Sequence, residues 1–387
     1  MIAIKRSKKL NIAKVLRTIW LNPGISRIAI SRDLELDKST VTLIVNELIE
    51  VGLVCPVAEG KAGPQGGRRP IQLIINKDFA CVIGVEFQPQ ACSLIAADLN
   101  GEIFTDRVVP VDFKGRALDE VFLPLVKAFV TNIKKGKHRI LALGFGAAGI
   151  IDPFQGIINQ SIPMNITTPY FFSQRIGDRF DYISQIENDA NCCAWGELVA
   201  HRNSDLKDFL FVLMEIRKSH PTDTSPSSIA VGMGVVIDGK VHRGATFSAG
   251  EFRSILWKKK SPTQFSTSST ATDGIEADAK LRKKIFRELG RHVAFFVNTL
   301  NLSHVVLGGD VEPYREELVE LLDKEIQTNW PYPNRVDCQI KFSSAAHLSV
   351  AFGAAGMMLG QLFAEKEIEG HRGDRLPLGI DLMTTAL

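Results

Sequence analysis

Residues 25–70 constrain the fold of this chain more than any other stretch, because helix, turn and hairpin signals follow one another there in a fixed succession. An amphipathic helix over residues 12–20 comes first, with apolar side chains spaced three and four apart. Ser26 is placed to cap a second, short helix, and Glu35-Leu36 form the turn after it. Asp37 is then placed to cap a third helix with an apolar stripe from Val41 to Ile49. This order predicts a helix-turn-helix.

A glycine-rich hairpin after the third helix completes the pattern. Strands are expected over residues 53–57 and 71–75, and the tip between them carries Arg68 and Arg69. A hairpin of this kind is typical of a wing, whose guanidinium groups enter a minor groove or bind phosphates. We therefore predict a winged helix-turn-helix that binds double-stranded operator DNA. The residues expected to contact DNA are Lys38, Ser39, Thr40, Thr42, Asn46, Arg68 and Arg69.

The distribution of charge supports the DNA-binding interpretation. Residues 1–80 contain 13 Lys and Arg against 7 Asp and Glu, a net charge of +6, whereas the whole chain carries +3, which leaves −3 for the remainder. Basic charge concentrated on a helical domain is the electrostatic signature of a nucleic-acid-binding protein. The alternative is a small helical domain that makes protein contacts and carries a solvated, charged hairpin.

Length and composition bound the rest of the molecule. A chain of 387 residues with 45% hydrophobic content is too long for one ordinary domain and can form sizeable cores. We expect three domains, over residues 1–76, 77–203 and 204–387. The sequence contains neither an apolar run of about 18 residues nor a signal peptide, so a soluble, cytoplasmic protein without membrane contacts is expected. The six cysteines are scattered and predict neither a disulfide framework nor a metal site.

Two similar successions of elements follow the wing. Strands are predicted over residues 81–87, 91–98 and 102–109, then a helix over 118–134 and a strand over 139–145. A second series begins with strands over 209–214, 229–237 and 240–243 and continues with alternating helices and strands. Asn100-Gly101 and Asp238-Gly239 supply tight hairpin turns at corresponding places. The repetition predicts two α/β lobes with a ligand-binding cleft between them.

Several short motifs give this layout a family resemblance. In chain order they are Gly66-Gly67-Arg68-Arg69-Pro70, Glu187-Asn188-Asp189-Ala190-Asn191, Ile237-Asp238-Gly239-Lys240, Arg243-Gly244-Ala245, Ala249-Gly250-Glu251 and Gly308-Gly309. With this order and spacing the chain resembles the ROK family, the repressor, open-reading-frame and sugar-kinase group, and in particular its longer members with an N-terminal winged helix. The resemblance implies a winged helix-turn-helix followed by a two-lobed actin-like ATPase fold.

The resemblance also implies roles for individual residues. Asp189 takes the place of the general base of the family kinases, and Asn188 that of the asparagine that contacts the sugar. Asp189 follows a strand and opens a helix, so capping that helix is the simpler explanation for it, and both roles are compatible. The sugar-binding residues implied are Asn165, Asn188, Asp189 and Glu251.

The two phosphate-binding turns of the family kinases have no clear counterpart. The first corresponds to residues 86–91, which contain Glu86 and Pro89 but no glycine. The second corresponds to a polar insert over 217–228 with two prolines and no glycine. Because backbone amides can approach phosphates only where side chains are small, we predict that the chain is no kinase, that Asp189 is a vestigial base, and that no cofactor binds. The alternative is a bifunctional DNA-binding, ATP-dependent sugar kinase.

The segment after Glu251 also departs from the family pattern. The histidine and cysteines that hold a structural zinc in family members are missing, so no metal is expected, and the loop between Trp257 and Asp273 is predicted to be mobile. We expect a sugar or sugar phosphate as effector and a homodimer or higher oligomer, whose candidate interfaces are the helices over 275–300 and 345–364. The combined prediction is a sugar-responsive transcription regulator. A regulator with a vestigial cleft that answers to a partner protein is a further alternative.

Overall fold

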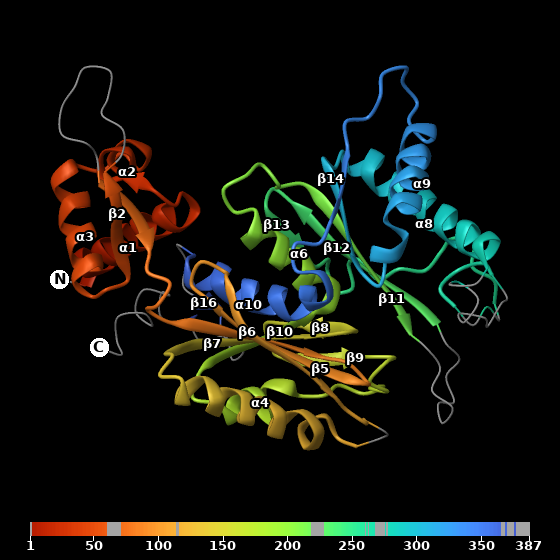
Figure 1. The fold of residues 1–387 in the computed structure, drawn as a ribbon, viewed down its shortest axis with the longest axis horizontal. Helices are drawn as coiled ribbons and strands as arrows, with labels where there is room; N and C mark the ends of the chain where they lie inside the picture. Colours follow the sequence, from red (N-terminus) through yellow and green to blue (C-terminus); the bar gives the residue numbers. More distant parts are fainter. Residues whose placement is uncertain are drawn as a thin grey trace. The chain divides into compact units, whose positions relative to one another are not determined.

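The computed structural model describes residues 2–59, 71–113, 116–217, 228–259, 261, 263–267, 275, 278–364, 368–369 and 375–376. The chain divides into two compact units, Met1–Glu187 with Ala354–Leu387, and Asn188–Gly353 (Figure 1). Among the described residues, no helix is both long enough and apolar enough to cross a membrane.

The first unit begins with three helices and a small sheet. In chain order the elements are α1 (Ile2–Leu21), β1 (Ile25–Ser26), α2 (Arg27–Asp33), α3 (Lys38–Glu50), β2 (Val54–Glu59) and β3 (Ile71–Ile75). The strands pair in the order β1-β3-β2, and all their pairings are antiparallel. The predicted apolar stripes are buried, with Leu16, Ile30 and Val45 at 1% exposure or less. These elements have the order and pairing of a winged helix.

The turn between α2 and α3 adopts the predicted conformation, but only one of the two expected helix caps forms. Ser26 Oγ accepts a hydrogen bond from the Ala29 amide at 3.3 Å and caps α2. Glu35 has φ +52°, a left-handed conformation that reverses the chain direction. Asp37 occupies the N-cap position of α3, but its side chain makes no capping hydrogen bond. The prediction that Asp37 caps this helix is therefore wrong.

Side-chain contacts attach α1 to the rest of the first unit. The indole Nε1 of Trp20 donates to the Leu99 carbonyl at 2.9 Å, and the ring stacks on Phe363 with centroids 4.6 Å apart and an interplanar angle of 7°. Arg17 Nη1 donates to the carbonyl of Phe363 at 3.2 Å. Trp20 and Phe363 are both buried, so residues from the two ends of the sequence form one packed contact.

A five-stranded sheet forms the centre of the first unit. It contains β4 (Cys81–Phe87), β5 (Ala91–Asp98), β6 (Ile103–Pro110), β7 (Ile140–Ala147) and β10 (Ile183–Asn188) in the order β10-β7-β4-β5-β6. The remaining elements are α4 (Leu118–Lys135), β8 (Ile150–Asp152), β9 (Ile157–Gln160), α5 (Phe172–Arg175), the 3-10 turn η1 (Gly177–Arg179), β16 (Ile368–Glu369) and β17 (Arg375–Leu376). Aromatic side chains from α4 and the sheet, including Phe87, Phe122 and Phe145, fill the core. The predicted strands and helix of this lobe are confirmed.

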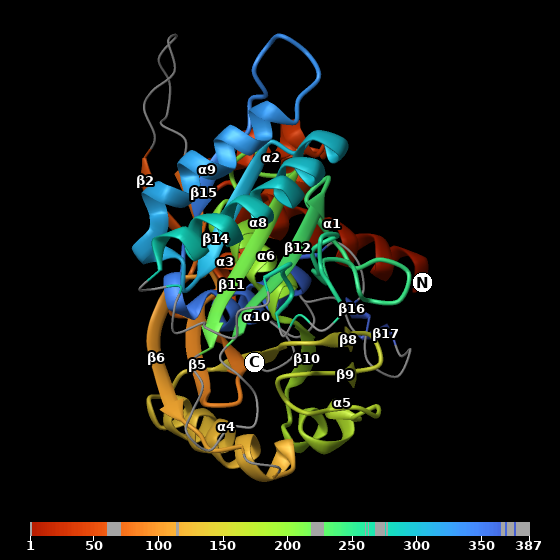
Figure 2. The ribbon, with the colours of Figure 1, turned by 90° about the vertical axis from the view of Figure 1, so that its right-hand side faces the viewer.

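The second unit repeats the same sheet topology. Its elements are α6 (Asp189–Ala200), β11 (Phe209–Arg217), β12 (Ser228–Ile237), β13 (Lys240–His242), α8 (Ala279–Leu300), β14 (His304–Gly309), η2 (Glu312–Tyr314), α9 (Arg315–Thr328), β15 (Gln339–Phe342), η3 (Ala346–Leu348) and the start of α10 (Ser349–Leu362). The order β13-β12-β11-β14-β15 matches β6-β5-β4-β7-β10 strand for strand. In both sheets the first strand pairs antiparallel with the second and parallel with the fourth along the chain. Helices α8 and α9 lie together beside this sheet (Figure 2).

Candidate functional site

The polar face of α3 is the candidate DNA-reading surface. Lys38, Ser39 and Asn46 are exposed, whereas Thr40 and Thr42 are partly buried. The Thr42 hydroxyl donates to the Lys38 carbonyl at 2.7 Å, so its proton is used within the helix. The surface therefore offers three exposed polar side chains and two less accessible threonines. Arg68 and Arg69 of the predicted wing lie outside the described residues.

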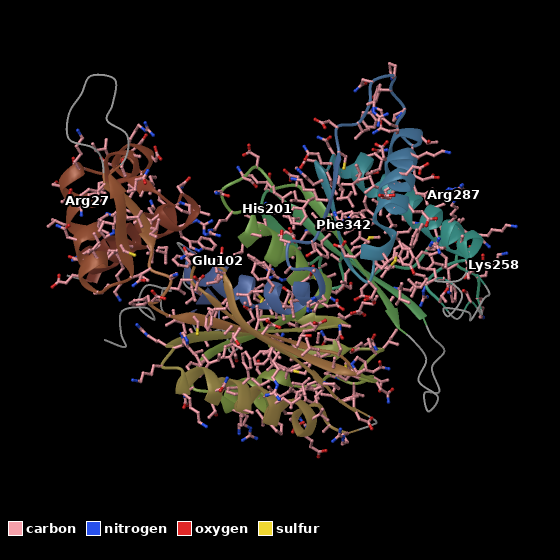
Figure 3. All side chains as sticks on the ribbon, viewed as in Figure 1. Arg27, Glu102, His201, Lys258, Arg287 and Phe342 are labelled. Atoms are coloured by element: carbon pink, nitrogen blue, oxygen red, sulfur yellow. The ribbon has the colours of Figure 1, made fainter. Side chains whose placement is uncertain are left out.

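Two residues on or beside this surface were not predicted from the sequence. Arg27, which lies at the start of α2 and is labelled in Figure 3, donates from Nη2 to Asn46 Oδ1 at 2.9 Å and thereby joins the two helices of the helix-turn-helix. Leu43 is 65% exposed although it lies in the middle of α3. Leu43 does not belong to the buried stripe, and its exposure beside polar residues is the signal that could have identified it.

The second candidate site begins where β10 passes into α6. Asn188 is the N-cap of α6, and its Oδ1 accepts from the Asn191 amide at 3.1 Å. Asp189 Oδ1 accepts from the Ala190 amide at 2.8 Å. Both predicted sugar-binding side chains therefore stabilise the start of the helix.

Glycines on β12 determine how closely α6 approaches the sheet. A Cβ atom at Gly234 would lie 2.5 Å from the Ala190 carbonyl oxygen. At Gly232 it would lie 3.2 Å from the Ala190 Cβ and 3.7 Å from Asp189 Oδ1. The two glycines have a packing role, because a larger side chain at either position would crowd the first turn of α6.

Glu251 is brought to the same place from a distant part of the sequence. It forms an isolated antiparallel bridge with Gly232, and the Met233 amide donates to the Gly250 carbonyl at 3.0 Å. Gly250 has φ +90°, and a Cβ there would lie 1.7 Å from the Met233 carbonyl oxygen. Only glycine fits, because both the conformation and the space exclude a side chain. Asp189 and Glu251 thus both lie next to Gly232.

The environment of Glu251 affects its ionisation. The residue is exposed to solvent, yet surrounding protein atoms partly desolvate the carboxyl group and raise the pKa of Glu251. A carboxyl group with a raised pKa releases its proton less readily, and therefore keeps hydrogen-donor character to a higher pH.

The segment after Glu251 is held by a network of hydrogen bonds centred on Gln264. The Gln264 side chain accepts from the Val231 amide at 2.6 Å and donates to the carbonyls of Val231 at 2.9 Å and Phe252 at 2.7 Å. Glu288, which is 4% exposed, accepts from the Ser266 amide and hydroxyl at 2.8 and 2.6 Å. Residues 263–267, which belong to the loop predicted to be mobile, are therefore hydrogen-bonded to β12 and α8, and the mobility of the loop stays a prediction.

Asn165 belongs to the other compact unit. It is exposed, has φ +52°, and its amide donates to the Ile162 carbonyl at 3.1 Å. The left-handed conformation suits asparagine better than most residues. Its role in sugar binding stays a prediction.

The β4–β5 turn occupies the first predicted phosphate position. The Gln88 amide donates to the Ala91 carbonyl at 2.9 Å, and the Gln88 side chain donates to Glu86 Oε1 at 2.6 Å. Glu86 is 4% exposed. The tip of the β11–β12 hairpin, the second position, lies outside the described residues.

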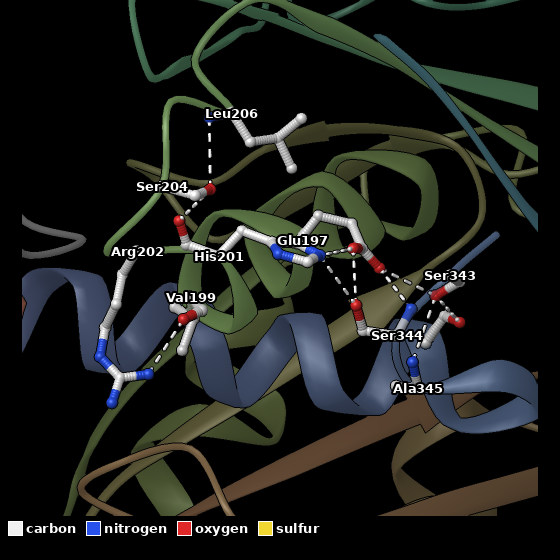
Figure 4. Close-up of polar contacts among 10 residues, drawn as sticks. Glu197, Val199, His201, Arg202, Ser204, Leu206, Ser343, Ser344 and Ala345 are labelled. Carbon is white, nitrogen blue, oxygen red and sulfur yellow. Dashed lines mark hydrogen bonds and ion pairs between the residues drawn. The ribbon is translucent and has the colours of Figure 1, made fainter. Parts of the chain in front are cut away.

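A buried carboxylate in α6 was missed by sequence reasoning. Glu197 is 1% exposed and accepts from the Ser344 amide at 2.8 Å, the Ser344 hydroxyl at 2.9 Å and the Ser343 hydroxyl at 3.1 Å (Figure 4). His201, one helical turn away, places Nε2 3.4 Å from the same carboxylate. The cluster joins α6 to the segment before α10.

Comparison with known proteins identifies the family of the large region. Residues 82–262 match the model of the ROK family. The chain contains a ROK family domain. Xylose repressors of Caldicellulosiruptor bescii and Bacillus spizizenii are 28% and 27% identical to it over 63% of its length, and the matches span 58% and 59% of those repressors. The N-acetylglucosamine repressor of Escherichia coli is 20% identical over 91% of the chain and 92% of its own length.

Solved structures show the fold of the ROK domain and of the longer chain. A ROK family transcriptional regulator described as a homologue of the E. coli MLC protein superposes with a TM-score of 0.73 at 18% identity, covering 98% of this chain and 99% of that one. A ROK glucokinase from Streptomyces griseus superposes with a TM-score of 0.54 at 18% identity, covering 72% of this chain and 99% of its own. The predicted two-lobed, actin-like fold is confirmed.

Proposed function

We propose that the chain is a DNA-binding transcription regulator of carbohydrate genes whose ROK domain senses a sugar or sugar phosphate. The observation that carries the proposal is the exposed polar face of α3 on a winged-helix arrangement joined to a ROK domain. The relatives named xylose repressor and N-acetylglucosamine repressor support repression as the output.

The convergence of Asp189 and Glu251 beside Gly232 supports the sensing role. Sugar recognition requires planar polar groups directed at hydroxyls, and carboxylates meet that requirement. Asn188 and Asn165 are the further proposed contacts. A ligand that binds one conformational state of the ROK domain more tightly than another would shift the population and, through it, operator affinity.

The kinase alternative is supported by Asp189 alone, and the β4–β5 turn argues against it. The Gln88 amide is already bonded within the turn, Pro89 has no amide hydrogen, and Glu86 carries a carboxylate where phosphates would bind. We therefore propose that Asp189 contacts ligand without acting as a base. ADP release in the presence of ATP and a hexose, abolished by Asp189→Asn, would establish the kinase instead.

A homodimer is proposed because a single winged helix-turn-helix of this size makes few base contacts. The described residues of α10 are nearly all buried, which leaves α8, with Phe295 at 60% exposure, as the better candidate interface. Sedimentation of wild type and Phe295→Glu tests this, and an unchanged dimer would exclude α8.

The decisive experiment selects duplexes from fragmented genomic DNA with the full chain and then measures their affinity over a salt series. We expect an enriched motif whose affinity falls steeply with salt. Arg68→Ala/Arg69→Ala should reduce the slope of log K against log salt by about 2. Thermal shift against xylose, glucose, N-acetylglucosamine and their phosphates tests the sensor. No enriched motif would overturn the DNA-binding proposal, and no shift with any of these sugars would contradict sugar sensing.

A further inference from the structure

The contact between α2 and α3 bears directly on what the recognition surface can read. Arg27 Nη2 lies 2.9 Å from Asn46 Oδ1. A guanidinium group only donates hydrogen bonds, so the Asn46 atom that faces it must be the oxygen. The amide orientation of Asn46 is thereby fixed, and its Nδ2 points away from Arg27.

This orientation changes the chemistry that Asn46 offers to a base. A free asparagine reads adenine through two bonds, accepting from N6 with its oxygen and donating to N7 with its nitrogen. Arg27 occupies one of the two lone pairs of Oδ1, so the amide keeps both N–H donors but only one acceptor position for a base. Guanine presents two acceptors to the major groove, N7 and O6, whereas adenine presents one acceptor beside a donor. An amide with two donors and a single remaining acceptor position therefore shifts the preference toward guanine and away from adenine.

An apolar side chain lies next to this donor group. Leu43 precedes Asn46 by three residues, one helical turn, so both lie on the same face of α3. Leu43 is 65% exposed, so covering it with another apolar group would be favourable. The C5-methyl group of thymine is the apolar feature of the major groove.

We propose that Arg27 fixes the amide orientation of Asn46 and occupies part of its acceptor capacity, so that Asn46 favours guanine over adenine, and that Leu43 contacts the methyl group of a neighbouring thymine. This inference rests on the proposed DNA-binding function and deepens it. Arg27 is a positioning residue, since it acts through Asn46, whereas Asn46 and Leu43 touch the bases.

The test is selection of binding sites from a random duplex library by the full chain and its variants, followed by sequencing. The wild type should select a guanine and an adjacent thymine in each half-site. Arg27→Ala releases the oxygen of Asn46, so the guanine position should shift toward adenine by about tenfold in relative preference. Asn46→Ala should abolish the preference there, and the double variant should match Asn46→Ala. Leu43→Ala should weaken selection of thymine and leave the guanine unchanged.

Two further variants separate positioning from charge and from folding. Arg27→Lys keeps a cationic donor beside Asn46 and should retain the guanine preference. Arg32→Ala removes an arginine whose side chain is 78% exposed and which pairs with Asp33 on the same helix, so it should leave every base preference unchanged. If Arg27→Ala fails to fold, the contrast between Arg27→Lys and Arg27→Met, which keeps the length of the side chain but has no N–H donor, supplies the same comparison.

The outcomes of the selection distinguish a failure of the Arg27–Asn46 proposal from a failure of the proposed DNA binding. A wild type that enriches no motif contradicts DNA binding itself. A wild-type motif that contains adenine in place of guanine, or one that Arg27→Ala and Asn46→Ala leave unchanged, overturns the role of Arg27 while DNA binding stands.

Discussion

Helices α3 and α6 both begin with polar residues that are predicted to be functional. These residues form hydrogen bonds within the helix in α6, whereas in α3 they are exposed to solvent. At the start of α6, Asn188 and Asp189 accept hydrogen bonds from amides of their own helix. At the start of α3, Asp37 makes no capping bond, and Lys38 and Ser39 are exposed. The polar residues of α6 therefore contribute to stability and to the proposed pocket at once, whereas those of α3 remain available to a partner.

The difference predicts how substitutions will separate stability from binding. Changes around α6 should lower the free energy of unfolding as well as affecting ligand binding. Changes on the exposed face of α3 should affect DNA binding and leave stability nearly unchanged, because surface substitutions away from buried features have small effects.

The largest stability effect is expected at Gly234. In Gly234→Ala the new Cβ would lie 2.5 Å from the Ala190 carbonyl oxygen, so α6 must move away from β12. The free energy of unfolding should fall by about 3 kcal/mol, measured by urea denaturation at pH 7. Gly232→Ala, whose nearest contact is a side-chain carbon at 3.2 Å, is the matched control and should lose less. Equal losses would mean that α6 does not pack on this strand as described.

Removal of the Gln264 side chain should have the next largest effect. Gln264→Ala leaves the Val231 amide and two carbonyls without this partner, at a cost of about 2 kcal/mol. Gln327→Ala is the matched control, because Gln327 bonds the amide and carbonyl of Val336 in the same manner at 3.0 and 3.1 Å. Both variants should lose stability, but only Gln264→Ala should also weaken a sugar-induced thermal shift. A shift that survives in Gln264→Ala would separate the network from the proposed pocket.

The capping asparagine of α6 allows a direct test of the comparison. Asn188→Ala should lower the free energy of unfolding by about 1 kcal/mol, and Asn188→Ser should restore most of the loss, because serine also caps helices. Asn46→Ala on α3 should change it by less than about 0.5 kcal/mol while weakening DNA binding. If the two alanine variants lose the same stability, the contrast between the helices is wrong.

The smallest effect concerns the protonation of Glu251. Because the folded protein raises the pKa of this carboxyl group, the folded state holds the proton more tightly than the unfolded state. Tighter binding of this proton stabilises the folded state fully at pH values below the ordinary pKa of a glutamate. This stabilisation is lost as the pH rises through the pKa of Glu251 in the folded protein. Glu251→Gln should therefore stabilise the protein slightly at pH 7, since solvent screens this exposed carboxyl group, and the gain should shrink toward pH 4. A gain that is constant with pH would rule out the titration of Glu251 as its cause.

Local sequence patterns made the N-terminal helices and the two five-stranded sheets predictable from the sequence. The spacing of apolar residues identified α3 and its buried stripe, and Asp238-Gly239 marked a hairpin in which both residues have positive φ, +52° and +68°. Such signals depend on neighbours within a few positions, which a sequence displays directly.

Contacts between distant segments were not predictable in the same way. The Arg27–Asn46 bond spans 19 positions, and the bond from Gln264 to Val231 spans 33. Nothing in the residue types fixes these partners, since arginine and glutamine are ordinarily solvated. The family resemblance singled out Asp189 and Glu251, but their shared neighbour Gly232 required the structure.

The packing of Trp20 on Phe363 has a consequence for protein engineering. Heads of regulators are attractive modules for building chimaeras, because each reads its own DNA sequence. In this chain the seam between α1 and the following sheet is made partly by a residue from near the opposite terminus. A transplanted DNA-binding domain without Trp20, or a recipient without an aromatic ring in place of Phe363, would have a cavity where the two rings stack. A functional chimaera must therefore take both segments from the donor: α1 with Trp20, and the segment that contains Phe363.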